Sequence, residues 1–574
     1  MPGVSIRRRA TTTPAVALSY LLVVCSIGAL RIGSLPVGPW EDIYTQLAGF
    51  WLFLFAGHLL MLWAVRWRRL GWATVSTFTL IATLAIVSMT LQWGYPFGLH
   101  DPWVHLDTLT TAQLNPVNNP YPLFHALLLA VTALTELSKQ QVLMGVPIIA
   151  VSAGIGFLSM LMRRIPLSAV AGQTLLIVGA PALLLGVIAR PFTLAMPFVL
   201  VIYWVVYAFT PRRAMAVLAV VLTFPLLWLH PFVAFCALVI ITTAFVARLF
   251  WVDDQQYRPG WKLTAMLSLL AAAFVVYVAF VSSIGQQVIA SIIETVGSLQ
   301  TQSPPAATDG PTQTQPSLFA KLLTPRGAVE ALARLAYVLS LGFAAVVSLL
   351  LPSPSRRFWH NSLVVMVAGS LIGTALLVGA VLSTKGITIY RVVQVAPLLV
   401  LPLAIGVFRQ YSKRPHELLA VGFAVMILIA GLGTAFGSPV TGKATYSATE
   451  PQVTGVQWVA QHRTTNIIGT WMTFWIIEGM YGKPASYRWS PGDMIGKQRY
   501  EERSAAYSWL VNDQEPDALY VVDRVERTRA QLEKRESNRR QPLNCLHQFR
   551  QFGNRIYDNR GTRVYLRGEA SVCT

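Results

Sequence analysis

Long apolar runs recur along the chain as far as about residue 436. Most of them can cross the roughly 30 Å of hydrocarbon in a bilayer as a helix. They lie near residues 14–30, 43–65, 71–92, 141–162, 166–189, 191–209, 214–229, 231–250, 263–284, 329–351, 360–382, 391–408 and 416–436. Only 12% of the residues are charged, and the mean hydropathy is +0.53. The sequence therefore predicts an α-helical polytopic membrane protein with about 13 transmembrane helices.

Two pairs of runs are separated by minimal turns, at Arg190-Pro191 and His230-Pro231. Proline cannot continue the preceding helix but suits the first turn of the next one, so we expect a helix to begin at each. The first apolar run follows Arg7-Arg8-Arg9, as in a signal peptide. No small-x-small cleavage site closes it, so we expect it to be retained as a transmembrane helix.

Basic residues are unevenly divided between the alternate loops. With the N-terminus inside, eighteen Lys and Arg fall on the cytoplasmic side and seven on the other. The positive-inside rule therefore predicts a cytoplasmic N-terminus and an external C-terminus in a multi-pass protein of the plasma membrane. The same rule accounts for most of the net charge of +20, so no nucleic-acid partner is expected. Membrane lipids are the expected surroundings.

This topology requires the apolar stretch Tyr121–Leu137 to lie on the external surface and not to cross. It is short, follows the Pro-rich run Asn115-Pro-Val-Asn-Asn-Pro-Tyr-Pro122, and carries His125 and Glu136. These features favour a helix in the plane of the membrane surface.

Three polar regions then fall outside the cell. Loops of about 93–140 and 285–328 belong to a transmembrane domain over 1–439, and the tail 440–574 is long enough for a small external α/β domain. Short apolar runs predict strands at 466–469 and 518–522, and Asn554–Leu566 reads as a hairpin that turns at Asp558-Asn-Arg-Gly561. Glu501–Leu510 and Arg524–Glu536 read as helices. An external tail would allow Cys545 and Cys573 to form a disulfide, whereas a reducing compartment would keep both as thiols.

Candidate catalytic residues gather in Gly98-Leu-His-Asp-Pro-Trp-Val-His-Leu-Asp107. If the segment after Pro102 is helical, Asp101 and His105 lie one turn apart and can form an acid/base pair or bind a divalent metal such as Mg²⁺ or Mn²⁺. Asp107 faces elsewhere. Asp101 could instead only cap the helix. His100 and His125 are candidates for substrate binding, although a histidine on an apolar face is more often a hydrogen-bonded core residue.

Cationic candidates lie at the external ends of other helices. Arg190, Arg391 and His230 could bind a phosphate or diphosphate, Arg through bidentate hydrogen bonds. Interface arginines also extend to lipid headgroups without a specific role. Lys385 is a weaker candidate of the same kind. The acidic pair Glu41 and Asp42, in the first external loop, could have a catalytic role, although acidic residues next to a helix N-terminus are also favourable through the helix dipole alone.

The pattern Gly-x-His-Asp-Pro-Trp-x-His-Leu, followed by Asn-Pro-Tyr-Pro-Leu-Phe-His125, resembles the acidic external loop of polytopic GT-C glycosyltransferases, such as oligosaccharyltransferases and protein mannosyltransferase-like enzymes. The resemblance covers about 30 residues as a motif and the whole chain as an architecture. It implies inverting transfer of a sugar from a polyprenyl-phosphate or polyprenyl-diphosphate donor to an external glycan, lipid or protein acceptor. Asp101 would act as base or metal ligand, His105 would assist it, and Arg391 would hold the donor phosphate.

The tail departs from that family at one motif. Thr470-Trp-Met-Thr-Phe-Trp-Ile-Ile-Glu-Gly-Met-Tyr-Gly-Lys-Pro484 is similar to the C-terminal domain of oligosaccharyltransferases, but it lacks the tandem Trp and the Asp of their Trp-Trp-Asp-Tyr-Gly motif. Trp471 and Trp475 could simply pack this domain against the membrane. Two other functions stay open: a transporter or flippase of lipid-linked sugars, and a non-enzymatic protein of envelope assembly. Polar groups gathered at one membrane face disfavour transport, which needs them at the midplane.

Overall fold

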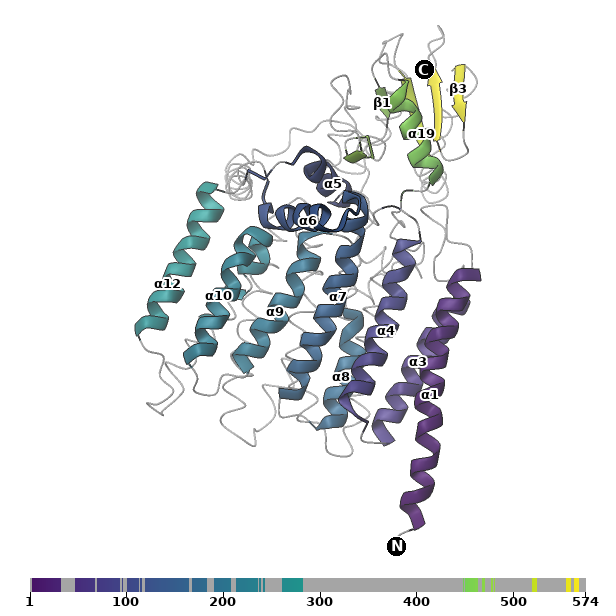
Figure 1. The fold of residues 1–574 in the computed structure, drawn as a ribbon, viewed down its shortest axis with the longest axis vertical. Coiled ribbons are helices and arrows are strands. Elements are labelled where there is room, and N and C mark those ends of the chain that lie inside the picture. The colour runs from purple at the N-terminus through teal and green to yellow at the C-terminus, as the bar shows by residue number, and fades with distance from the viewer. Residues whose placement is uncertain are drawn as a thin grey trace, which may run out of the picture.

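Figure 1 shows a bundle of roughly parallel helices with a small sheet beyond one end, in a computed structural model of the chain. The structure describes residues 3–32, most of 47–242, 261–281 and, in the C-terminal part, 448–462, 467–469, 476–480, 519–523, 554–558 and 562–566, with short gaps. The four apolar runs between 329 and 436, the loop 285–328 and the expected helices Glu501–Leu510 and Arg524–Glu536 lie outside these residues. The total of 13 transmembrane helices therefore stays a prediction.

Four of the described helices are long and apolar enough to cross a membrane, so the chain is a membrane protein. They are the segment Pro14–Ile32 of α1 (Gly3–Ile32), α3 (Ala48–Trp67), α4 (Trp72–Leu91) and α7 (Lys139–Arg164). Shorter apolar helices occupy five further predicted runs in part: α8 (Ala169–Ala182), α9 (Pro191–Tyr207), α10 (Arg213–Leu229), α12 (Trp261–Val276) with the π-helix η3 (Tyr277–Val281), and residues 231–235. As expected, helices start at both Pro191 and Pro231.

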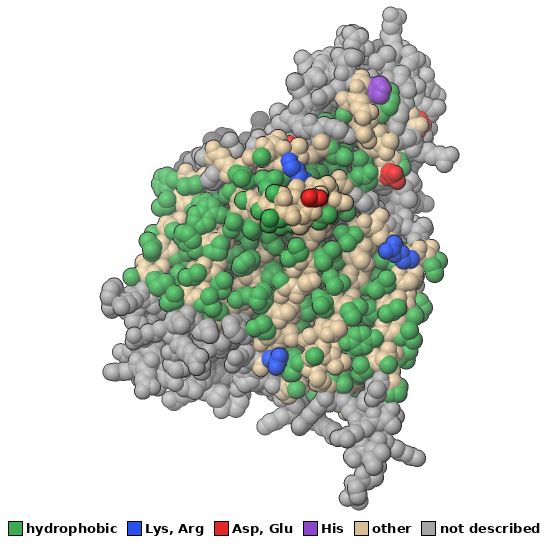
Figure 2. Space-filling view, in the orientation of Figure 1, with side chains coloured by type: hydrophobic (Ala, Val, Ile, Leu, Met, Phe, Trp, Pro, Cys, Tyr) green, Lys and Arg blue, Asp and Glu red, His purple; other side chains and the backbone are tan. Residues whose placement is uncertain are grey.

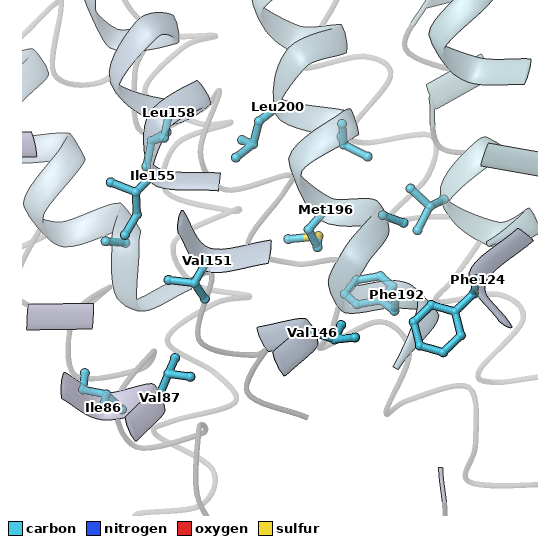
Figure 3. Packing of buried hydrophobic residues seen from close by; sticks show 14 of the residues in the cluster. Ile86, Val87, Phe124, Val146, Val151, Ile155, Leu158, Phe192, Met196 and Leu200 are labelled. Carbon is cyan, nitrogen blue, oxygen red and sulfur yellow. The ribbon is translucent and has the colours of Figure 1, made fainter. Parts of the chain in front are cut away.

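The helices pack through apolar ridges that repeat every three or four residues. On α9 the buried side chains Phe192, Met196 and Leu200 line one face, and Val151, Ile155 and Leu158 line the neighbouring face of α7. Figure 3 shows these two rows in the core. In a bilayer such contacts stabilise helix pairs through close packing, because lipid chains are as apolar as the side chains themselves. The core thus holds the helix ends at fixed positions.

Helix α6 (Pro122–Thr135) lies across the ends of the upright helices, as expected for Tyr121–Leu137 (Figure 1). Its 14 residues span about 21 Å along the axis, too little for a hydrocarbon layer of about 30 Å. Phe124, His125 and Leu128 are buried on one face, and Leu127 and Leu134 are exposed on the other. The length and direction of α6 therefore support the prediction that this apolar stretch does not cross.

The N-terminus and the C-terminal part lie at opposite ends of the bundle, and α5 (Asp101–Thr111) and α6 share the end of the C-terminal part (Figure 1). Figure 2 shows that hydrophobic side chains cover most of the described surface of the bundle on the side in view. The few charged side chains there lie toward its two ends. Both observations agree with the predicted division into two polar faces. Which face is cytoplasmic stays a prediction.

The C-terminal part contains α19 (Glu450–Gln461) and a four-stranded sheet in the order β1-β2-β4-β3. The strands are β1 (Ile467–Gly469), β2 (Leu519–Asp523), β3 (Asn554–Asp558) and β4 (Thr562–Leu566). The first pair is parallel, and β2 and β3 each pair antiparallel with β4. The strands and the hairpin predicted around Asp558-Asn-Arg-Gly561 are therefore confirmed. Residues 439 and 440 lie outside the described residues, so the domain boundary there stays a prediction.

Candidate functional site

Helix α5 carries the two predicted catalytic residues. It begins at Asp101, so Asp101 and His105 lie one helical turn apart, which confirms the expected phase. The side chain of Asp101 is outside the described part of the structure, so its role as cap or base stays open. The His105 ring is buried, with 6% of its surface exposed. Asp107, two residues further on, is half-buried.

His105 and His125 form a buried pair that joins α5 to α6. Nδ1 of His105 lies 3.1 Å from Nε2 of His125, and the ring centroids are 5.1 Å apart. Phe124 and Tyr121 pack edge-on against the His105 ring, at 5.2 and 5.8 Å between centroids. The pair is held by one hydrogen bond and an aromatic wall, so the orientation of His105 is fixed from α6.

Asn119 continues this chain of hydrogen bonds on the far side of His125. Its Oδ1 accepts the backbone N–H of Tyr121 at 2.9 Å, and its Nδ2 lies 2.9 Å from Nδ1 of His125. Only 3% of Asn119 is exposed. No motif in the sequence marks this residue as part of a site. It precedes Pro120 in the Pro-rich run before His125, where an asparagine side chain commonly bonds the backbone two residues on.

Burial sets the charge of His125. Only 1% of its surface is exposed, and desolvation lowers its pKa from 6.5 to about 4, against the opposing effect of the backbone carbonyl of Tyr121. That carbonyl oxygen lies 3.0 Å from Nδ1. The ring is therefore neutral near pH 7 and carries one proton. Both ring nitrogens face protein groups, which agrees with the alternative of a hydrogen-bonded core histidine. The substrate-binding role expected for His125 stays a prediction.

An aromatic row links this pair to the predicted cations. The ring of Tyr121 stacks on His230 at 5.3 Å between centroids, and Phe192 packs edge-on against His230 at 5.4 Å. The guanidinium carbon of Arg190 lies 5.5 Å from the centroid of Phe192. Arg190 itself is only 5% exposed. One row of contacts at one end of the bundle thus joins His105 of α5 and His125 of α6 to Arg190, the buried cation before α9.

The helix starts explain why Arg190 and His230 stand there. The carbonyl of Arg190 accepts the N–H groups of Thr193 and Leu194 at the start of α9. Nδ1 of His230 accepts the N–H of Val233 at 3.2 Å, which caps the helix that Pro231 begins. The proline turns predicted from the sequence therefore place both side chains at the ends of their helices.

A π-helix at the end of α12 reaches the same place. The hydroxyl of Tyr277 in η3 donates to the carbonyl of Pro120 at 3.4 Å, directly before Tyr121. The Tyr277 ring also packs edge-on against Trp228 of α10, at 5.8 Å. Single π-helical turns occur often at functional sites, because they change the direction of one or two side chains. Here the turn fastens the segment that carries Asn119 and Tyr121.

The C-terminal part covers the other side of α5. Ile476 and Ile477 are fully buried in the same core as Trp103, the largest of the fully buried side chains described. The carbonyl oxygen of Gly479 lies 3.4 Å from the hydroxyl of Thr110. The segment that resembles the oligosaccharyltransferase domain therefore contacts the helix of Asp101 and His105, although Trp471 and Trp475 lie outside the described residues.

Four of the predicted site residues meet in this arrangement: His105, His125, His230 and Arg190. His100 and Arg391 lie outside the described residues, as do Lys385, Glu41, Asp42, Cys545 and Cys573. Their proposed roles stay predictions. Tyr121, Asn119, Phe192 and Tyr277 join the site only in the structure.

The described residues do not make up a divalent metal site. Within them, no three His, Cys, Asp or Glu side chains come close enough to hold an ion. His105 directs Nδ1 to His125, so the ring offers only Nε2 as a ligand atom, and Mg²⁺ prefers oxygen ligands. The expected metal at Asp101 and His105 would therefore depend on the Asp101 carboxylate.

Solved structures that are similar to this chain include two of the same protein. Two single-particle cryo-EM structures of arabinofuranosyltransferase AftD from Mycobacteria, one of a mutant, match 87% of this chain each. Their identities to it are 15% and 14%, with TM-scores of 0.41 and 0.43. This chain covers 42% and 40% of them, less than half of their length. No family model and no curated protein matches the sequence.

Proposed function

We propose that this protein is a membrane glycosyltransferase that moves a sugar from a polyprenyl-phosphate or polyprenyl-diphosphate donor to an acceptor on the external face. The observation that carries the proposal is the meeting of His105, His230 and the buried Arg190 at one end of an apolar bundle, on the side of the C-terminal part. A donor whose lipid lies in the bilayer presents its phosphate and sugar at that level. The resemblance of the α5 loop to the acidic loop of GT-C enzymes supports the same reaction.

The chemistry needs a base for the acceptor and cations for the leaving group. The acceptor hydroxyl oxygen bonds to the anomeric carbon while the bond from that carbon to the phosphate oxygen breaks, with inversion at the carbon. The hydroxyl proton passes to the Asp101 carboxylate, which His105 assists from one turn further along α5. The electron pair of the broken bond stays on the phosphate, which leaves as an anion.

Arg190 is the described cation best placed to stabilise that anion. A guanidinium binds two phosphate oxygens through parallel hydrogen bonds, and its attraction to an anion is stronger in a buried position than in water. Arg190 is buried and belongs to the turn that begins α9, so its backbone is fixed. Arg391, which we predict to lie at the same face, would supply a second cation.

The test uses the full-length chain in membranes supplied with a polyprenyl-phosphate sugar and an external acceptor fraction. We expect Asp101→Asn and Asp101→Ala each to lower the rate of sugar transfer at least 100-fold, because neither variant has a carboxylate to accept the proton of the acceptor hydroxyl. Glu136→Gln is the matched control, since this exposed carboxylate stands on the same face at the end of α6. It should leave the rate unchanged.

Two outcomes would overturn the proposal. Normal product from both Asp101 variants, correctly inserted, would exclude Asp101 as the base. Movement of the intact lipid-linked sugar between leaflets without transfer would instead indicate a flippase. A chelator added to the same assay tests the metal: a rate lost on chelation and restored by Mg²⁺ or Mn²⁺ would assign Asp101 to metal binding, and an unchanged rate would leave it as the base.

A further inference from the structure

The hydrogen bonds behind His105 determine which of its nitrogens carries a proton. The chain runs from the N–H of Tyr121 through Asn119 and His125 to Nδ1 of His105, with donor–acceptor distances of 2.9, 2.9 and 3.1 Å. The three polar side chains, Asn119, His125 and His105, are each more than nine-tenths buried. Water therefore cannot readily substitute for these bonds, and the direction of each bond constrains the next.

The first bond fixes the direction of the Asn119 amide. The N–H of Tyr121 lies at the start of α6, where helix N–H groups have no partner within the helix, and it donates to Oδ1 of Asn119. A flipped amide would set two donors against each other there. Nδ2 therefore faces Nδ1 of His125 and can only donate.

Two groups compete for Nδ1 of His125, the Asn119 amide at 2.9 Å and the carbonyl oxygen of Tyr121 at 3.0 Å. The carbonyl already accepts the backbone N–H of His125 at 3.3 Å. It therefore remains hydrogen-bonded whether or not Nδ1 carries a proton. Asn119 therefore determines whether Nδ1 of His125 carries a proton, because a protonated Nδ1 would place its N–H against the NH₂ group of Asn119.

We propose that Asn119 and His125 are positioning residues that hold His105 with its proton on Nε2. His125 accepts from Asn119 at Nδ1, so its single proton is on Nε2 and is donated to Nδ1 of His105. Neutral His105 then carries its own proton on Nε2. It acts as a hydrogen-bond donor toward an anionic oxygen, such as a carboxylate or a phosphate, and not as the base.

This inference rests on the proposed function only where it names the anion, since the assignment of the protons is a property of the free protein. In the proposed reaction, it leaves Asp101 as the sole base. The Nε2–H of His105 would then bind an oxygen of the Asp101 carboxylate or of the departing phosphate. The same wall of Phe124 and Tyr121 that fixes the ring plane fixes the direction of that donor.

The experiment is ¹⁵N NMR of the full chain labelled at histidine in lipid nanodiscs, with His105→Gln and His125→Gln used to assign the two rings. We expect both rings to be protonated on Nε2. Asn119→Asp keeps an acceptor for the N–H of Tyr121 but replaces the donor toward His125, so both rings should change to Nδ1–H. Asn115→Asp, in the same loop but exposed, is the matched control and should change neither.

Protonation of His125 on Nδ1 in the unmodified chain, or identical spectra for it and Asn119→Asp, would overturn the assignment. Should the new carboxylate prevent insertion, Asn119→Leu removes the donor without a charge and predicts the same change. In the transfer assay, Asn119→Asp should lower kcat at least tenfold with little change in the donor KM. If the spectra behave as expected and the unmodified chain transfers no sugar, the proposed function fails and the proton assignment stands.

Discussion

Burial keeps His125 neutral, and that neutrality has a cost at low pH. A histidine in the unfolded chain titrates near 6.5, whereas the native ring has a pKa of about 4. Between these values the unfolded chain binds a proton that the native protein does not. The stability contributed by the neutral ring is therefore fully present above about pH 6.5 and is lost as the pH falls toward 4.

We expect this residue to produce a measurable loss of stability in mild acid. Between pH 7 and pH 5 the free energy of unfolding should fall by about 2 kcal/mol through His125 alone. Chemical unfolding in detergent, compared between the unmodified chain and His125→Gln, isolates this contribution because other titrating groups are common to both. Equal pH dependence in the two proteins would show that His125 does not titrate with a lowered pKa.

At the level of elements, α5 is held from two directions, by α6 on one side and by the C-terminal segment 476–480 on the other. The contact with that segment is close because residue 479 has no side chain. A Cβ built on Gly479 would lie 3.0 Å from the carbonyl oxygen of Trp103 and 3.2 Å from its ring atom Cε3. Either the segment or the first turn of α5 would have to move.

Gly479→Ala should therefore loosen the contact that positions α5. Overpacking of this kind costs about 1–3 kcal/mol, which we expect to appear as a lower thermal midpoint and faster hydrogen exchange in the amides of α5. Gly145→Ala is the matched control, because nothing lies within 4 Å of the added methyl group on α7. A similar effect of the two substitutions would contradict the proposed contact.

For the whole molecule, the orientation in the membrane follows from the division of basic residues, and the position of α6 makes it testable. With α6 lying on the surface, the positive-inside rule predicts that the start of α7 is external and that its end at Arg164 is cytoplasmic. A reporter that needs an external location should therefore be active when it is fused after Lys139. A reporter that needs a cytoplasmic location should be active when it is fused after Arg164. A cytoplasmic reporter after Lys139 would mean that the predicted topology is inverted.

Much of this architecture was predictable, because hydropathy and turn residues act locally. Hydropathy and length predict the described apolar runs and the surface position of Tyr121–Leu137. The restricted backbone of proline predicts the helix starts at Pro191 and Pro231. The turn residues predict the hairpin at Asn554–Leu566. The candidate residues Asp101 and His105 could be predicted as a pair, since one helical turn separates them. None of these inferences needs knowledge of a distant neighbour.

The sequence by itself thus determined which of the described segments are apolar enough to enter the membrane and where polar residues stand along them. Only the tertiary structure decided which polar residues meet: His105 with His125 and Asn119, Tyr121 with His230, and Gly479 with Trp103. The physical reason is that the membrane helices are apolar on all sides, so hydropathy does not specify how each one turns about its axis. Close packing sets that rotation, and with it the side of α5 that the C-terminal segment covers and the tautomer that Asn119 imposes.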